Sequence, residues 1–379
     1  MPREMPLDEV MRAVLARDEV VAYLNGSHGE SGPKAAARVH AYLDELRTRQ
    51  RYPIYRALKH PLYPILRKLT RITEHPEIIR SATSKARVVY VSNHRSHLDY
   101  LLEPLVLEDE SIRPPVIAAG INLFGGPLGL IHRHVTGAIP IRRNMKDPGY
   151  LITLKAYVAE ILQRHDLLFY IEGGRSYRGE LKAPKTGLLH AALQAEVPNL
   201  LFVPCAVAYD LVLEDHILAH QQVKGKQRPF TRELTEMVRY AVGYKSRAFV
   251  TYGEPIDASA RDAHDRSDVL ELAHHLRDVI GRLMKVLPTS IVAAAMRPSI
   301  RRADLEGRVS GLIETLSAAG ANLETRNARD AVESAVRLLA ARGVIVAEGG
   351  TYRVRDRSVL RYYARTITHL LPVPPSRAH

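Results

Sequence analysis

The sequence predicts an α/β fold, with a mostly parallel sheet flanked by helices between a helical N-terminal segment and a mainly helical C-terminal segment. Short apolar runs bounded by turn residues alternate with helical patterns in the middle of the chain, which is typical of strands joined through helices. After residue 280 this alternation stops and helical periodicity dominates.

The expected strands are Val88–Val91, Val116–Ala119, Ala138–Ile141, Leu167–Ile171, Leu200–Val207 and Ala248–Tyr252, with helices over Tyr150–Gln163 and Thr186–Gln194. We therefore predict three regions. Residues 1–80 form a helical, basic amphipathic segment, residues 81–285 form the α/β domain, and residues 286–379 form a mainly helical domain with a β-hairpin. Pro204 inside an apolar run indicates a strand end or a sheet edge.

The N-terminal segment has apolar residues at helical spacing over Leu7–Leu24, and Pro33 begins a second helix that runs to about Gln50. Between Arg51 and Arg71, basic residues are interleaved with tyrosines and leucines, and no acidic residue interrupts them. This stretch could lie on an anionic bilayer, where each near-surface cation contributes about 1 kcal/mol. Alternatively, it packs on the α/β domain as a helical hairpin with its cations in solvent.

The C-terminal region is expected to contain helices over Ile291–Met296, Asp304–Ala319, Ala328–Arg342 and Val359–Leu371, and a hairpin over Val344–Val354. The hairpin should turn at Gly349-Gly350. A hairpin between helices with basic flanks resembles the wing of a winged helix, which keeps a nucleic-acid-binding alternative open.

The composition limits the classes of partner. The chain has 379 residues and a net charge of +13, so an anionic partner is expected: nucleic acid, an anionic membrane surface or a phosphorylated small substrate. The absence of Trp and the scarcity of Phe disfavour a stacking platform for single-stranded nucleic acid. One cysteine excludes an internal disulfide framework and a multi-cysteine metal site, and we expect Cys205 to be a buried, inert thiol.

The sequence predicts neither a signal peptide nor a transmembrane helix. The first residues lack the apolar core of a signal peptide, so none is predicted. The apolar stretch from Val116 to Ile131 is interrupted by glycines and Pro127, and is too short for a transmembrane helix. It is expected to be a loop that lines an apolar tunnel, touches the bilayer surface or is simply buried.

The candidate catalytic pair is His94 and Asp99. Val88–Val91 suits a buried strand, and Ser92 and Asn93 favour a helix start directly after it. Asp99 can then accept the Nδ1 proton of His94 and leave Nε2 free as a general base. Because the chain has 17 histidines, roughly one His-x4-Asp spacing is expected by chance, so this pair needs support from other stretches.

Candidate anion-binding residues follow the third expected strand. Arg142 and Arg143 follow the third expected strand, and guanidinium groups match phosphate oxygens in a bidentate manner. The alternative is a solvated arginine pair after an edge strand. Lys185, just before a helix, is a third candidate phosphate contact.

The segment Glu172-Gly173-Gly174-Arg175-Ser176 follows a buried strand and is itself followed by Arg178. Its glycines would let backbone amides approach an anion that the arginine neutralises, although an ordinary turn is the alternative. Glu172 is expected to pair with Arg175 or with a substrate hydroxyl, because an unpaired buried carboxylate is costly.

Taken in order, these stretches resemble the glycerol-3-phosphate acyltransferase superfamily, in its branch of glycerol-3-phosphate and dihydroxyacetone-phosphate acyltransferases. His94–Tyr100 resembles the His-x4-Asp motif, Gly137–Arg142 the second motif, Glu172–Ser176 the third, and Val203–Asp210 the fourth. Pro184–Gly187 and Leu360–Ala364 are also similar to that branch.

Two positions depart from the family pattern. Pro140 stands in place of an aromatic residue, and Tyr177 in place of a second arginine, for which Arg178 could substitute. The likeness covers Val88 to about Pro255 and, loosely, the C-terminal segment.

The resemblance implies a glycerol-3-phosphate 1-O-acyltransferase that moves a fatty acyl group from acyl-CoA or acyl carrier protein to glycerol 3-phosphate, giving lysophosphatidic acid. His94 would take the hydroxyl proton and Asp99 would hold the imidazole. The implied substrate-binding residues are Arg142, Arg143, Glu172, Gly173, Gly174, Arg175, Ser176, Arg178 and Lys185. No metal and no bound cofactor are implied.

The expected partners are glycerol 3-phosphate, a long-chain acyl-CoA or acyl carrier protein, and an anionic membrane surface, with the protein peripheral at the cytoplasmic face of the cell membrane. Two alternatives stay open. The acceptor could be dihydroxyacetone phosphate or a lysophospholipid. The chain could instead bind nucleic acid, which is disfavoured because the basic charge is spread along the chain and the motifs lie elsewhere.

Overall fold

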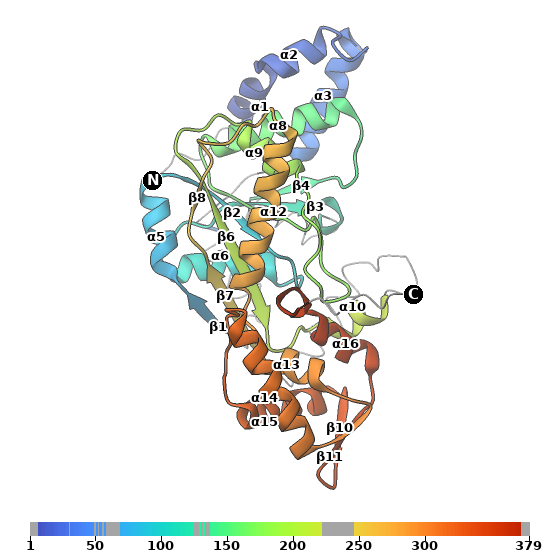
Figure 1. Ribbon diagram of the computed structural model, residues 1–379. Helices are drawn as coiled ribbons and strands as arrows, with labels where there is room; N and C mark the ends of the chain where they lie inside the picture. The colour runs from blue at the N-terminus through green and yellow to red at the C-terminus, as the bar shows by residue number, and fades with distance from the viewer. Residues whose placement is uncertain are drawn as a thin grey trace.

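The computed structural model describes residues 7–29, 31–48, 69–124, 137–221 and 246–372, and residues 51, 53, 54, 57, 129 and 132 between them. Its described residues form an eight-stranded sheet in the order β1-β7-β6-β2-β5-β3-β4, with β8 beside β6 (Figure 1). Most neighbouring strands are parallel, and β7 and β8 run antiparallel to β6. The predicted mostly parallel α/β sheet is therefore confirmed.

The strands are β1 (Leu69–Glu74), β2 (Arg87–Ser92), β3 (Val116–Gly120), β4 (Ala138–Ile141), β5 (Leu167–Tyr170), β6 (Leu200–Tyr209), β7 (Ser246–Tyr252) and β8 (Ile256–Asp257). All the strands expected from the sequence form. The sequence missed β1 and β8: β8 has only two residues, and β1 has one neighbour and a mixed polar pattern. The sheet therefore takes one strand from the segment that the sequence assigned to the helical N-terminal region.

Pro204 marks neither a strand end nor a sheet edge, because it lies inside β6, which itself lies between β7 and β2. The backbone N–H of Gly253 donates to the Pro204 carbonyl at 2.9 Å. A residue in a strand points its N and C=O to the same side, so the missing N–H of Pro204 faces the turn between β7 and β8. The proline consequently removes no hydrogen bond between paired strands.

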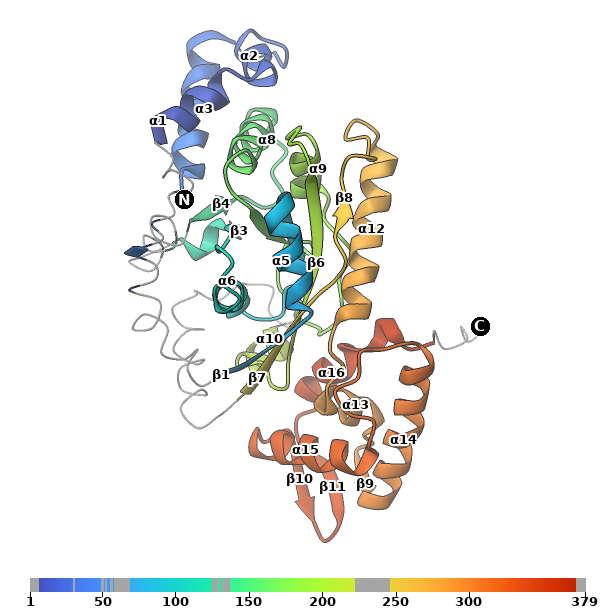
Figure 2. The same ribbon diagram turned by 90° about the vertical axis from the view of Figure 1, so that its left-hand side faces the viewer.

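Helices cover both faces of the sheet (Figures 1 and 2). One buried cluster joins Val88 and Tyr90 to α5 (Pro76–Lys85) and α6 (Asp99–Asp109), and another joins Val89 and Val91 to α8, α9 and α12. The bounds of these last helices are Pro148–Leu162, Gly187–Leu193 and Arg266–Leu283. Burial on both faces explains why β2 is a continuous apolar run without polar alternation.

The N-terminal helices pack on α8 at one end of the sheet (Figure 2). The helix expected over Leu7–Leu24 is divided into α1 (Leu7–Leu15) and α2 (Asp18–Leu24), and α3 spans Gly32–Leu46. Arg17 between α1 and α2 is extended and pairs with Glu160 of α8 at 2.9 Å, while acidic residues open α2, as helix N-termini favour.

Two expectations fall largely outside the described residues: most of the basic amphipathic stretch from Arg51 to Arg71, and part of the apolar stretch from Val116 to Ile131. In the part of the chain that the structure describes, no helix combines the length and apolar character that crossing a membrane requires.

The C-terminal region lies at the opposite end of the sheet from α1–α3 (Figure 2). It contains α13 (Pro288–Ala295), β9 (Ser299–Arg301), α14 (Arg302–Ala318), α15 (Ala328–Ala341), β10 (Ile345–Glu348), β11 (Thr351–Val354) and α16 (Arg357–Arg365). The expected hairpin at Gly349-Gly350 is confirmed, and β9 adds a third strand to it. The last helix is shorter than expected, because a separate short 3₁₀ turn covers Thr368–Leu370.

This region has the order of elements of a winged helix, but α15 does not carry a basic outer face. Its exposed charged residues are Arg329, Asp330, Glu333 and Arg337, two of each sign. A helix that contacts nucleic-acid phosphates carries an excess of basic residues. The nucleic-acid alternative thereby loses its main support.

Candidate active site

A cavity of about 720 Å³ opens where β2, β3, β4 and β5 end. His94, Arg143, Arg175 and Lys185 border it together with apolar residues of β3 and α8. Residues that follow parallel strands meet at one edge of the sheet, which is where ligands bind in such folds. The cavity therefore combines a polar, basic wall with an apolar wall.

The expected contact between His94 and Asp99 is present. Nδ1 of His94 lies 2.8 Å from Oδ2 of Asp99, and both side chains are buried. Because a carboxylate can only accept, Nδ1 carries the proton and Nε2 keeps a lone pair. Burial is the main cause that lowers the pKa of His94, and Arg175 adds to it, while Asp99 acts in the opposite direction. The imidazole is therefore neutral at pH 7 and able to accept a proton.

Asp99 is held by further donors. The backbone amides of Arg95 and Ser96 donate to Oδ2 at 2.6 and 3.0 Å, and the hydroxyl of Tyr209 donates to Oδ1 at 2.6 Å. These contacts stabilise a fully buried carboxylate in one orientation. Tyr209 belongs to the fourth motif, and the sequence analysis assigned it no role. The only sequence feature that could have indicated this role is a tyrosine at the carboxyl end of a buried strand.

The start of α6 differs from the expectation. Neither Ser92 nor Asn93 caps it, since α6 begins at Asp99 and Leu98 precedes it. The side chain of Asn93 instead exchanges hydrogen bonds with the backbone of Val207, at 3.0 and 2.7 Å. That side chain fastens the loop after β2 to β6, so His94 stands on a tethered loop rather than at a helix start.

Glu172 is buried and bonds to two backbone amides. Its Oε1 accepts from the amide of His94 at 3.0 Å and its Oε2 from that of Lys182 at 2.9 Å. The expected pairing of Glu172 with Arg175 is wrong, because Arg175 pairs with Glu214 at 3.4 Å. The two backbone amides, rather than the guanidinium of Arg175, are the donors that the buried carboxylate of Glu172 requires.

The third motif also holds the other side of the His94 backbone. The amide of Ser176 donates to the carbonyl of His94 at 3.2 Å. Together with Glu172, this contact fixes the backbone of His94 through both its N–H and its C=O. The third motif thus positions the loop that carries the imidazole.

Glu214 is a site residue that the sequence analysis missed. It is buried just before α10 (Asp215–Gln221), and it accepts from the hydroxyl of Ser96 at 2.8 and 3.0 Å and from the amide of His97 at 2.6 Å. Burial raises its pKa, whereas Arg175 lowers it. An acid directly after the apolar run Leu211–Leu213 was the only local signal.

Glu103 was missed as well. It lies one helical turn after Asp99 on α6 and is buried. Burial, followed by the charge of Asp99, raises the pKa of Glu103 to about 8. At neutral pH this group is therefore a protonated acid behind the His94–Asp99 pair.

Three cations gather around Gly173 and Gly174. A Cβ on Gly174 would lie 3.2 Å from Nη1 of Arg143, and a Cβ on Gly173 would lie 3.0 Å from Cγ of Lys185. Lys182 donates from Nζ to the Gly174 carbonyl at 2.8 Å. The glycines thus leave room for cationic side chains to cross the backbone at the cavity.

The Arg143 guanidinium has no acidic partner within the described ranges. Burial is the main cause that lowers the pKa of Arg143, and the charge of the neighbouring Arg175 lowers it further. Burial likewise lowers the pKa of Lys182, and Arg143 and Lys185 reinforce the shift while Glu172 opposes it. A bound anion would offset both the burial of these cations and the repulsion between them.

Two predicted substrate-binding residues are placed differently. Arg142 borders the cavity, but its Nε donates to Glu45 of α3 at 2.6 Å and its Nη2 donates to the other oxygen of the same carboxylate. Tyr42 and Tyr150 flank its guanidinium. Arg178 is exposed and does not border the cavity. Arg178, which was expected to replace the second arginine of the third motif, therefore does not contribute to the cavity wall.

Cys205 is buried, as expected, and burial raises its pKa well above the usual thiol value. A thiol of this kind stays protonated and is a poor nucleophile. It therefore offers no acyl-accepting group beside His94.

Comparisons with known proteins agree with the motifs. Residues 70–208 match the model of the Acyltransferase family. The glycerol-3-phosphate acyltransferase of Aeromonas hydrophila subsp. hydrophila is 36% identical over 239 residues, covering 60% of this chain and 29% of the relative. Residues 70–208, which include the His94–Asp99 pair, are therefore similar to the acyltransferase family.

A second relative, the glycerol-3-phosphate acyltransferase of Actinobacillus succinogenes, is 38% identical to this chain over 193 residues, covering 49% of the chain and 24% of the relative. The chain thus spans under a third of the length of these relatives. The crystal structure of the 1-acyl-sn-glycerophosphate acyltransferase PlsC from Thermotoga maritima matches with a TM-score of 0.36 and 13% identity, over 72% of this chain and 93% of that one.

Proposed function

We propose that this chain is a glycerol-3-phosphate 1-O-acyltransferase, which transfers a fatty acyl group from acyl-CoA or acyl carrier protein to glycerol 3-phosphate and releases lysophosphatidic acid. The observation that carries the proposal is the buried His94–Asp99 pair beside a cavity that also holds Arg143 and Lys185. A general base and a phosphate-binding wall are the two elements that acylation of a phosphorylated alcohol requires.

In the proposed reaction, Nε2 of His94 takes the proton of the acceptor hydroxyl while its oxygen attacks the thioester carbonyl carbon. Asp99 stabilises the imidazolium that forms. The tetrahedral intermediate then collapses, the bond between carbon and sulfur breaks, and the leaving thiolate takes the proton from Nε2. No metal and no bound cofactor take part in this proposed step.

The cavity walls suit the two substrates. Arg143 and Lys185 would bind the phosphate of the acceptor. Arg175 also borders the cavity, where it forms an ion pair with Glu214. Leu123, Leu151 and Phe169 border the cavity on its apolar side and would contact the acyl chain. The ring of Tyr170 stacks on His94 with the centroids 4.1 Å apart and would keep the imidazole plane fixed. Holding hydroxyl and thioester in attacking geometry would supply much of the acceleration.

We further propose that the protein acts as a peripheral protein at the cytoplasmic face of the cell membrane. The net charge of +13 would attract it to anionic lipids, and the proposed product is an amphipathic lipid that partitions into the bilayer.

An acceptor comparison tests the proposed function. Thiol release from a long-chain acyl-CoA, and separately from acyl carrier protein, is measured with glycerol 3-phosphate, dihydroxyacetone phosphate and a lysophospholipid. We expect the highest kcat/KM with glycerol 3-phosphate. Release with the lysophospholipid alone would replace the proposed acceptor, and no release with any acceptor would contradict acyl transfer.

A further inference from the structure

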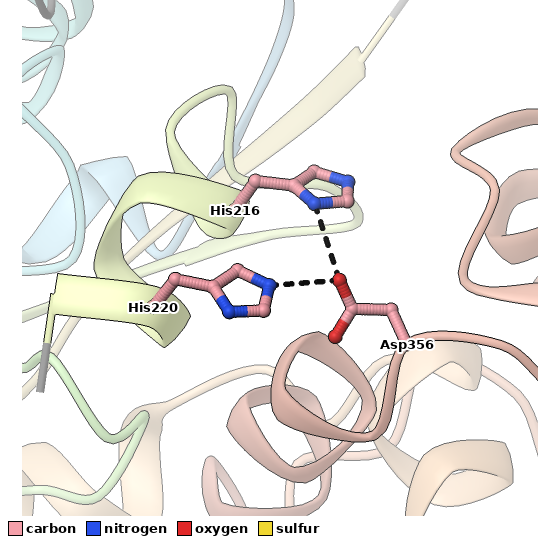
Figure 3. Close-up of side chains that lie close together, drawn as sticks. All are labelled: His216, His220 and Asp356. Carbon is pink, nitrogen blue, oxygen red and sulfur yellow. Dashed lines mark hydrogen bonds and ion pairs between the residues drawn. The ribbon is translucent and has the colours of Figure 1, made fainter. Parts of the chain in front are cut away.

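A cluster of metal-ligating side chains lies outside the active site, where α10 meets the start of α16. Figure 3 shows His216 and His220 of α10 directed at the same carboxylate oxygen of Asp356. Nδ1 of His216 lies 3.4 Å and Nε2 of His220 lies 2.9 Å from Oδ2 of Asp356. The three ligand atoms lie within 4.8 Å of one another.

The hydrogen bond on the far side of His216 determines which nitrogen can bind a cation. Nε2 of His216 lies 3.3 Å from the carbonyl oxygen of Arg342. A carbonyl can only accept, so Nε2 donates to it, and Nδ1 is the nitrogen directed at Asp356. Nδ1 of His216, Nε2 of His220 and Oδ2 of Asp356 thus converge, and an ion placed between them could bind all three.

Backbone hydrogen bonds also orient the carboxylate of Asp356. Asp356 is the N-cap of α16, and its Oδ1 accepts from the amides of Ser358 and Val359, each at 3.0 Å. This leaves Oδ2 for the two imidazoles. Ligands in metal sites are commonly oriented by such outer hydrogen bonds to backbone groups, and here both His216 and Asp356 have them.

We propose that His216, His220 and Asp356 bind one divalent transition-metal ion of the Zn²⁺ class. Imidazole and carboxylate ligands suit such ions. Bonds of about 2.0–2.1 Å separate two tetrahedral ligand atoms by about 3.4 Å, so the observed spacings need only small side-chain shifts. The His220 side chain is 55% exposed, which gives the ion a path from solvent and leaves room for water as a fourth ligand.

The ion would join two parts of the chain that are far apart in sequence. Glu214 and Asp215 directly precede His216, and Asp215 accepts from the hydroxyl of Tyr363 on α16 at 2.7 Å. The metal would therefore reinforce an existing contact between α16 and the segment that supports the catalytic loop. Its role is structural, and it lies apart from His94 and the proposed reaction.

The test uses the full chain without a histidine tag, treated with a chelator and then titrated with Zn²⁺. We expect one bound ion per chain by calorimetry and a Tm that rises with Zn²⁺ concentration, because the ion binds the folded state. His220→Ala and Asp356→Asn should each weaken Zn²⁺ binding by at least about tenfold. The asparagine keeps a side-chain oxygen that can cap α16.

Two matched variants locate the ion. His274→Ala removes an exposed histidine of α12, and His94→Ala removes the buried one at the cavity, and neither should change Zn²⁺ affinity. The proposal is overturned if the native chain binds no Zn²⁺ saturably, if His220→Ala and Asp356→Asn bind it as tightly as the native chain, or if His94→Ala abolishes binding.

Discussion

The hydroxyl of Tyr209, at the end of β6, donates to Oδ1 of Asp99 at 2.6 Å, on the side of the carboxylate away from His94. The acid that orients the imidazole is therefore itself oriented from a different strand. The geometry of the pair depends on the sheet as well as on the spacing within the His-x4-Asp motif.

Tyr209→Phe should remove that hydrogen bond without altering the substrate contacts. Because the acceptor is a buried charge, we expect the free energy of unfolding to fall by about 1.5–3 kcal/mol, measured by urea denaturation. We expect kcat to fall about tenfold with the KM for glycerol 3-phosphate unchanged, since about 1.4 kcal/mol of transition-state stabilisation corresponds to tenfold in rate. Unchanged stability and unchanged kcat would contradict a positioning role for Tyr209.

Arg143→Ala and Arg178→Ala form a matched pair of charge removals. Arg143 borders the cavity and Arg178 lies outside it. We expect Arg143→Ala to raise the KM for glycerol 3-phosphate at least about tenfold, the effect of losing a charge-assisted hydrogen bond, and Arg178→Ala to leave it unchanged. Equal effects of the two variants would mean that net charge, not a phosphate site, is responsible.

The ion pair between Arg142 and Glu45 should contribute to stability. Since the Arg142 side chain is 38% exposed, the coupling energy from a double-mutant cycle with Arg142→Ala and Glu45→Ala should be about 1 kcal/mol or less. Glu45→Ala should leave the acceptor KM unchanged. A zero coupling energy, together with a large rise of KM in Arg142→Ala, would restore the substrate role expected from the sequence.

Glu103 should make stability depend on pH. Its pKa is raised from 4.5 to about 8, so the folded protein keeps a proton that the unfolded chain releases. The free energy of unfolding should therefore fall as the pH rises from about 4.5 to about 8. Glu103→Gln should flatten this dependence, as measured by denaturation at several pH values. An identical slope in both proteins would show that Glu103 is ionised in the folded state at neutral pH.

Much of the fold was predictable from the sequence because the inner strands are buried on both faces and so appear as apolar runs. β1 was not predicted because an edge strand with polar residues does not form an apolar run. The contact between His94 and Asp99 was predictable because His94 lies on the loop after β2 and Asp99 is the first residue of α6, so that their short spacing limits the distance between them.

The remaining site contacts join residues that local spacing does not relate. Tyr209 is 110 positions from Asp99, and Glu214 is 118 positions from Ser96. Arg142 is 97 positions from its partner Glu45. Such contacts depend on the order of strands in the sheet and on where the N-terminal helices pack, and neither is encoded in a local pattern.

The most direct test of the account is acyl transfer by His94→Ala. The variant protein is first shown to be folded by an unfolding transition like that of the native chain, and thiol release from acyl-CoA is then measured with glycerol 3-phosphate. We predict a loss of kcat of about 10²–10⁴, the usual contribution of a positioned general base. Turnover at the native rate in the folded variant would contradict the claim that His94 is that base.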